Sequence, residues 1–231
     1  EGRVVFVDQA LPGERVRARF TSAKGNFAEA VCEEVLLGAA ERVEPICPHF
    51  SKCGGCSLQH MSSVAQLAFK EAMVHEKLSH SVGTANYERL EVISGPITGY
   101  RRKARLTVRY VGKKDRVMVG FREKHSSFIA DMDSCAILDT QVANLLPQLG
   151  ELVSAMHSKK FIPQIEVAIG DKLNHQSDCA LVFRHLAALP ASDLLLLEVF
   201  GKNHSLDIYL QPQGAETVHK FYPAGTEDRL F

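Results

Sequence analysis

The stretch Cys47-Pro-His-Phe-Ser-Lys-Cys53-Gly-Gly-Cys56 places three thiols within ten residues, in the spacing C-x5-C-x2-C. The two glycines between the last pair allow the backbone to fold tightly. Polar and small residues surround these thiols, whereas cysteines that only fill a core sit among apolar residues. Converging thiolates bind either a structural zinc ion or an iron–sulfur cluster. The stretch therefore predicts a metal centre.

A fourth ligand has to come from elsewhere in the chain, and Cys135 is the first candidate. Cys32 and Cys179 are alternatives, but both lie in alternating apolar segments, which favours core positions. Zinc sites more often contain two C-x2-C pairs or histidines at knuckle spacing. One triplet with a distant cysteine therefore favours a [4Fe-4S] cluster, while His49 and His60 keep zinc open as an alternative.

The composition is that of a globular chain, with 231 residues, 45% hydrophobic content and a net charge of zero. This length is sufficient for one large domain or two smaller ones. No apolar run is long enough to span a membrane, and six cysteines are too few for a disulfide-stapled secreted domain. We therefore expect a cytoplasmic protein. Because the chain lacks an initiator Met and stops inside an apparent element, we also expect it to be part of a longer protein.

The predicted fold class is α+β, in two domains. Residues 1–44 read as short strands over 4–7, 15–20 and 27–36, which fits a small OB-like β-barrel. Residues 45–231 mix strands and helices without regular alternation, which indicates an α+β domain that contains the cysteine loop. Its expected helices are 63–79, 139–157 and 191–200, the first with an apolar stripe of Val64, Leu67, Val74 and Leu78. Its expected strands are 100–111, 117–122, 164–169, 178–185, 206–211 and 217–222, and residues 112–116 are expected to turn the first two into a β-hairpin.

The segment from Arg101 to Lys124 carries ten Lys or Arg and only two acidic residues. In a strand, alternate side chains share a face and lie roughly 6.5–7 Å apart, similar to the pitch of phosphates in a nucleic-acid strand. The alternative is a solvated face, although like charges crowded on one face repel. The candidate nucleic-acid contacts are Arg101, Lys103, Arg105, Arg109, Phe121 and Arg122, together with Arg15, Arg17 and Arg19 in the predicted barrel.

Catalytic motifs are missing from the sequence. No two glycines are separated by a single residue, so there is no G-x-G cofactor loop, and there is no P-loop. No Ser/His/Asp set or pair of carboxylates stands out. We therefore predict no catalytic residue in this chain, which has the features of recognition without those of catalysis.

Several stretches, read together, resemble one family. They are Leu11-Pro-Gly-Glu14, Cys47-Pro-His-Phe, Cys53-Gly-Gly-Cys56 with Gln59-His60, Gly99-Tyr-Arg-Arg-Lys-Ala-Arg-Leu106, Val119-Gly-Phe-Arg122, and Cys135 before Ile137-Leu138. This set is similar to the bacterial 23S ribosomal RNA (uracil-5)-methyltransferases of the RlmD/RumA type. The resemblance runs from about Arg3 to the end of the chain.

The resemblance implies a role for each part of the chain. Residues 1–44 would form a TRAM domain, an RNA-binding barrel that is incomplete at its N-terminus. Cys47, Cys53, Cys56 and Cys135 would be the ligands of a [4Fe-4S] cluster. The basic segment would belong to a central domain that binds 23S ribosomal RNA. The S-adenosylmethionine fold and its catalytic residues would follow Phe231, and the helix over 63–79 would pack on that domain.

Alternatives of other classes remain open from the sequence. The chain could be a zinc-stabilised RNA-binding module or an iron–sulfur redox protein, although redox carriers of the ferredoxin type need no basic stripe. In the leading interpretation the isolated chain is inactive and does not bind S-adenosylmethionine. No membrane association and no obligate protein partner are expected.

Overall fold

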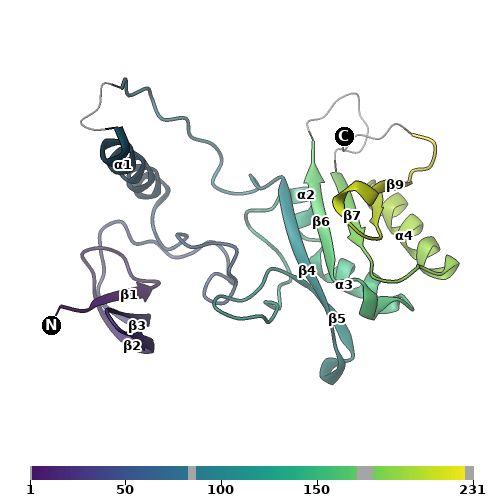
Figure 1. Cartoon of the computed structure of the whole chain (residues 1–231), viewed down its shortest axis with the longest axis horizontal. Coiled ribbons are helices and arrows are strands. Elements are labelled where there is room, and N and C mark those ends of the chain that lie inside the picture. The colour runs from purple at the N-terminus through teal and green to yellow at the C-terminus, as the bar shows by residue number, and fades with distance from the viewer. Residues whose placement is uncertain (1, 83–86, 171–178, 227–231) are drawn as a thin grey trace. The chain divides into compact units, whose positions relative to one another are not determined.

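The computed structural model describes residues 2–82, 87–170 and 179–226. The chain forms two compact units (Figure 1). Unit 1 comprises Glu1–Ser51 and Cys56–Gly95, and unit 2 comprises Lys52–Gly55 and Pro96–Phe231. The predicted domain boundary at residues 44–45 falls inside unit 1, and the cysteine loop contributes residues to both units.

Unit 1 begins with a three-stranded sheet made of β1 (Val4–Asp8), β2 (Arg15–Lys24) and β3 (Phe27–Leu37). The strand order is β1-β3-β2, with β1 parallel and β2 antiparallel to β3. All three strands start at the residues expected from the sequence. Among the described residues these strands form an open sheet, and the closed TRAM barrel stays a prediction.

Glu14 of the Leu-Pro-Gly-Glu turn is the centre of a hydrogen-bond network. Its carboxylate accepts the backbone N–H of Leu11 at 2.8 Å and of Ala39 at 3.2 Å, and it forms a salt bridge with Arg42. Arg42 also donates to the carbonyl oxygen of Gln9 at 2.8 Å. The hydrogen bond from Arg42 is the main cause that lowers the pKa of Glu14 to about 2. The turn is therefore tied to the segment that leads into the cysteine loop.

Unit 1 also contains the helix α1 (Ser63–Val82), close to the predicted range of 63–79. Ser62 caps its start, where its hydroxyl accepts the N–H of Ala65 at 3.3 Å. Val64, Val74 and Leu78, which the sequence places on the apolar stripe, are exposed. The expected packing of this helix on another domain stays a prediction.

Unit 2 is built on a six-stranded sheet of order β5-β4-β6-β7-β8-β9. Only β7 and β8 run parallel to each other, which gives the mixed α+β architecture that the sequence predicted. The strands are β4 (Lys103–Val111), β5 (Arg116–Gly120), β6 (Gln164–Ile169), β7 (Cys179–Arg184), β8 (Asp207–Gln211) and β9 (His219–Tyr222). The predicted hairpin is confirmed, with a 3-10 turn over Gly112–Lys114 between β4 and β5.

The helix expected over 139–157 is two helices, so that prediction was wrong in its continuity. The structure has α2 (Thr140–Ala143) and α3 (Leu146–Ala155), separated at Asn144 and Leu145. Pro147 lies in the first turn of α3. Proline has no backbone N–H to donate, so it suits a helix start and interrupts a helix interior.

The helices α3 and α4 (Ala191–His204) cover one face of the six-stranded sheet (Figure 1). The side chains of β4 that point to this face, Ala104, Leu106 and Val108, are buried. The approach of α3 is close, because Gly150 has no side chain: a Cβ there would lie 3.0 Å from the carbonyl oxygen of Val117. The alternate residues of β4 point to the other face of the sheet.

None of the helices described in the structure is long and apolar enough to cross a membrane.

Candidate metal-binding cysteines and RNA-binding surface

The segment Lys52–Gly55 is held in unit 2 by strand-like pairing with residues 122–124. Gly54 N–H donates to the Arg122 carbonyl at 2.9 Å, and Lys124 N–H donates to the Lys52 carbonyl at 2.8 Å. A Cβ on Gly54 would lie 3.1 Å from the Arg122 oxygen, and a Cβ on Gly55 would lie 3.4 Å from the Phe121 ring. Gly54 therefore suits this position because a backbone oxygen approaches it closely, whereas a Cβ on Gly55 would make an ordinary van der Waals contact.

Arg101 connects the two segments of unit 2 that carry the predicted ligands Cys53 and Cys135. Its backbone N–H donates to the Ile137 carbonyl at 2.7 Å, and its own carbonyl accepts the N–H of Asp139 at 3.1 Å. Its guanidinium donates to the Gly55 carbonyl at 3.2 Å and lies 5.4 Å from the centre of the Phe121 ring. The structure gives Arg101 and Phe121 a role in holding the cysteine loop, and their assignment as nucleic-acid contacts stays a prediction.

Gln59 has the corresponding role for Cys47 and Cys56, the two predicted ligands that belong to unit 1. Its amide oxygen accepts the backbone N–H of Cys47 at 3.1 Å, and its amide nitrogen donates to the sulfur of Cys56 at 3.2 Å. In unit 2 the N–H of Gly55 donates to the sulfur of Cys53 at 3.3 Å. N–H donors aimed at sulfur stabilise a thiolate and are typical of the surroundings of metal-bound thiolates.

The four predicted cysteine ligands have the chemistry that a thiolate-bound metal requires. All four predicted ligands are cysteines that form no disulfide among the described residues; Cys47, Cys53 and Cys135 are buried and Cys56 is half-buried. Cys47 and Cys56 belong to unit 1, and Cys53 and Cys135 to unit 2. Across residues 2–82, 87–170 and 179–226, no three His, Cys, Asp or Glu side chains form a group that could hold a metal ion. The ligand set therefore stays a prediction.

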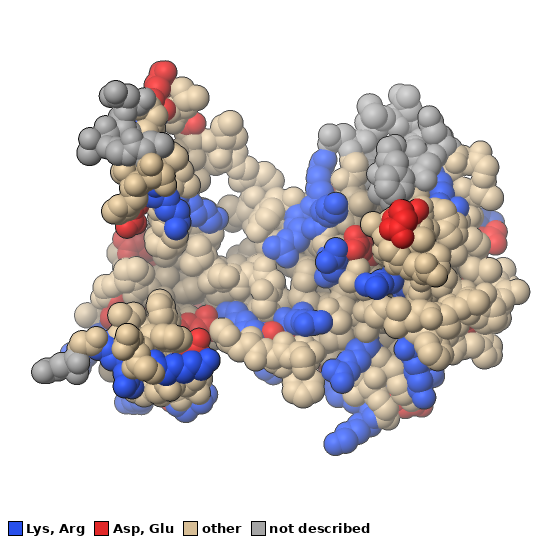
Figure 2. Space-filling view, viewed as in Figure 1, with Lys and Arg blue, Asp and Glu red and all other residues tan. Residues whose placement is uncertain are grey.

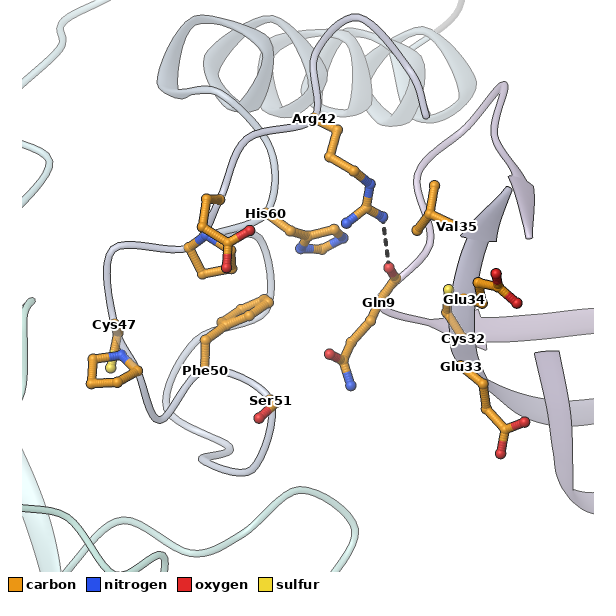
Figure 3. A pocket seen from close by; sticks show the side chains of 13 residues that line it. Gln9, Cys32, Glu33, Glu34, Val35, Arg42, Cys47, Phe50, Ser51 and His60 are labelled. Carbon is orange, nitrogen blue, oxygen red and sulfur yellow. Dashed lines mark hydrogen bonds between the residues drawn. The ribbon is translucent and has the colours of Figure 1, made fainter. Parts of the chain in front are cut away.

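A cavity of about 340 Å³ lies in unit 1 beside Cys47 (Figure 3). The ring of His60 is buried against Phe50, with 5.3 Å between the ring centres. Cys32 lines the same cavity, so it remains an alternative thiol near Cys47. The lining residues are Gln9, Cys32, Glu33, Glu34, Val35, Arg42, Glu44, Pro45, Cys47, Pro48, Phe50, Ser51 and His60.

The basic residues of β4 lie on the face of the sheet opposite α3 and α4. Lys103, Arg105 and Arg109 are exposed, as their alternation with apolar residues predicts. Figure 2 shows Lys and Arg side chains over β4 and over its hairpin with β5. Arg122, which follows β5, is also exposed. The structure thus brings several of the candidate RNA contacts onto one surface, which we call the β4 surface (Lys103, Arg105 and Arg109).

The second basic stripe, on β2, is partly neutralised. Arg15, Arg17 and Arg19 are exposed as predicted, but Arg17 forms a salt bridge with Glu34 and Arg19 with Glu33, the latter at 2.6 Å. The register of β2 and β3 shifts between Arg17 and Ala18, and this bulge brings two consecutive glutamates next to the stripe. Sequence alternation alone could not show this pairing.

Comparison with known proteins finds relatives that carry the same protein name. The chain is 49% identical, over 97% of its length, to the 23S rRNA (uracil(1939)-C(5))-methyltransferase RlmD of Nitrosococcus oceani, and it covers 49% of that protein. It is 42% identical over its whole length to the protein of the same name from Alcanivorax borkumensis, of which it covers 51%. The chain thus spans about half the length of the curated relatives it matches. No family model matches the chain.

A solved structure shares the fold of the chain. It is the tRNA (uracil-54, C5)-methyltransferase of Pyrococcus abyssi in complex with S-adenosyl-L-homocysteine, with a TM-score of 0.61 and 21% identity. The match covers 92% of this chain and 48% of that one. The relatives confirm the resemblance that the sequence motifs indicated. The chain is therefore homologous, over nearly its whole length, to about half of a 23S rRNA (uracil-C5)-methyltransferase of the RlmD type.

Proposed function

We propose that this chain is the RNA-recognition part of an S-adenosylmethionine-dependent enzyme that forms 5-methyluridine in 23S ribosomal RNA. The observation that carries the proposal is the β4 surface, where cations stand on a sheet face opposite the covering helices. Cations spaced along a strand match the spacing of phosphates. Relatives named as 23S rRNA methyltransferases favour this function over a redox carrier.

We assign a [4Fe-4S] cluster to Cys47, Cys53, Cys56 and Cys135. The hydrogen bonds from Gln59 and from the Gly55 N–H to sulfur support thiolates at two of these positions. When bound, the cluster would link the 47–56 segment to the segment around Cys135, so its role would be to stabilise the fold. A zinc ion held by the same thiols is the alternative.

This chain contributes to the reaction by binding the RNA that flanks the target uridine. Extruding a base from its stack costs a few kcal/mol, which protein contacts to the flanking RNA have to offset. We assign methyl transfer and S-adenosylmethionine binding to a part of the parent enzyme outside this chain, since the sequence has no Gly-rich cofactor loop. The exposed apolar residues of α1 suit packing on that part. A ribosomal RNA substrate implies a cytoplasmic location.

Two substitutions on the β4 surface test the proposal. Lys at position 105 keeps the charge but loses the planar fork of Arg, so Arg105→Lys should weaken binding to the cognate RNA loop about five- to tenfold and to unrelated RNA much less. Arg109→Ala should weaken binding to both RNAs about equally and reduce the slope of log affinity against log salt by about one. Fluorescence-anisotropy titrations at several salt concentrations measure both effects.

The matched control is Lys202→Ala, which removes an exposed cation from α4. It should leave affinity and salt slope unchanged. If Arg105→Lys and Arg109→Ala behave like this control, the β4 surface is a solvated face and the RNA binds elsewhere.

A further inference from the structure

A hydrogen-bonded cluster of polar side chains interrupts the cations of the β4 surface. Arg105 on β4 stands directly opposite Glu166 on β6 in the antiparallel register. The Nε of Arg105 donates to Oε1 of Glu166 at 3.0 Å, and the Nε2 of Gln164 donates to the same oxygen at 2.7 Å. The side chain of Glu166 is 26% exposed, and that of Arg105 is 71% exposed. The carboxylate is therefore held in place while it remains accessible.

The cluster retains unused hydrogen-bonding capacity on its open side. The donors of Arg105 and Gln164 both reach Oε1, and within the described residues no hydrogen bond reaches Oε2 of Glu166. The terminal nitrogens of Arg105 likewise make no hydrogen bond to any described residue. An acceptor thus lies next to the donors of a guanidinium group.

The carboxylate of Glu166 would repel RNA phosphates, so phosphate binding alone does not explain its place on this surface. It stands among exposed cations, with Lys103 and Arg109 on β4 and Arg184 on β7. An exposed ion pair stabilises a fold by only about 1 kcal/mol or less. A fixed carboxylate next to an arginine is, however, an arrangement that distinguishes bases by their donors and acceptors.

We propose that Arg105, Glu166 and Gln164 form a site that reads one unpaired base carrying a ring N–H beside a carbonyl group, that is, uracil or guanine. The ring N–H would donate to Oε2 of Glu166, and the adjacent carbonyl would accept from Arg105. Adenine and cytosine present a ring nitrogen that is itself a hydrogen-bond acceptor. Two acceptors, this nitrogen and the carboxylate oxygen, would then face each other without a proton between them. This inference rests on the proposed RNA-binding function and adds base selectivity to it.

The test is Glu166→Gln in the full chain, titrated with short single-stranded RNAs that differ only in one central base. The wild type should bind the RNAs with central U or G roughly tenfold more tightly than those with A or C. Glu166→Gln should remove this preference by weakening binding to the U and G probes. If Glu166 only repelled RNA phosphates, Glu166→Gln would instead raise the affinity for every RNA, because the variant loses a negative charge.

The matched control is Asp131→Asn, which removes an exposed carboxylate that pairs with Lys114 and Arg116. It should raise affinity for all four probes by the same factor and keep the base preference. A Glu166→Gln protein that behaves like Asp131→Asn, or a wild type without base preference, would overturn the inference alone. A wild type that binds none of the RNAs would overturn the proposed function as well.

Discussion

Cys53→Ser should lower the melting temperature of the anaerobically purified protein by roughly 10 °C or more, together with loss of iron. Cys53 is a buried thiol whose sulfur accepts the N–H of Gly55. In metal sites of this kind, the free energy of metal binding is part of the free energy of folding. Loss of one ligand should therefore destabilise the fold before it changes any RNA contact. Thermal denaturation with parallel iron determination measures both effects.

Two other cysteines provide the controls for Cys53→Ser. Cys179→Ser places a hydroxyl in a buried position of β7, so it reports the cost of a buried serine without loss of a ligand. It should keep the iron. Cys32→Ser tests the alternative thiol that lines the cavity beside Cys47, and it should also keep the iron. An unchanged melting temperature in Cys53→Ser would contradict a structural role for the cluster.

Glu14→Gln should destabilise the protein by about 2–3 kcal/mol at neutral pH, because it breaks an ion pair whose carboxylate is buried. The side chain of Glu14 is 0% exposed, and Arg42 would lose its partner. Guanidinium chloride unfolding measures the change. Glu34→Gln is the control, because its salt bridge to Arg17 joins side chains that are 50% and 66% exposed, and it should cost less than about 1 kcal/mol.

The same carboxylate predicts how stability depends on pH. The fold lowers the pKa of Glu14 from 4.5 to about 2, chiefly through the hydrogen bond from Arg42. A lowered pKa means that the ionised form is favoured in the folded state, so its stabilisation is complete above about pH 4.5 and is lost as the pH falls towards 2. Glu14→Gln should flatten the pH profile in this window. Equal profiles in both proteins would show that another group is responsible.

Periodicity in the sequence was sufficient where a single local pattern decides the structure. The alternation around Arg105 and Leu106 placed β4 and assigned its two faces correctly, because strand side chains alternate with a period of two. The turn around Gly112 and the range of β6 followed in the same way. The break between α2 and α3 was missed although Pro147 marks it, because the apolar pattern continues across the break.

The contacts of the candidate site depend on residues that are distant in the chain. No local pattern shows that Arg101 reaches Gly55, or that Gln59 links Cys47 to Cys56. Glu166 became a candidate only through the register of β4 and β6, which pairs it with Arg105. The sequence therefore identified the types of residue needed, whereas their partners required the tertiary structure.

Determination of iron, acid-labile sulfide and zinc in the anaerobically purified chain shows whether Cys47, Cys53, Cys56 and Cys135 hold an iron–sulfur cluster. We expect about four iron and four sulfide ions per chain, with no stoichiometric zinc. One zinc ion per chain without sulfide, or a fully folded chain that contains neither metal, would contradict this assignment.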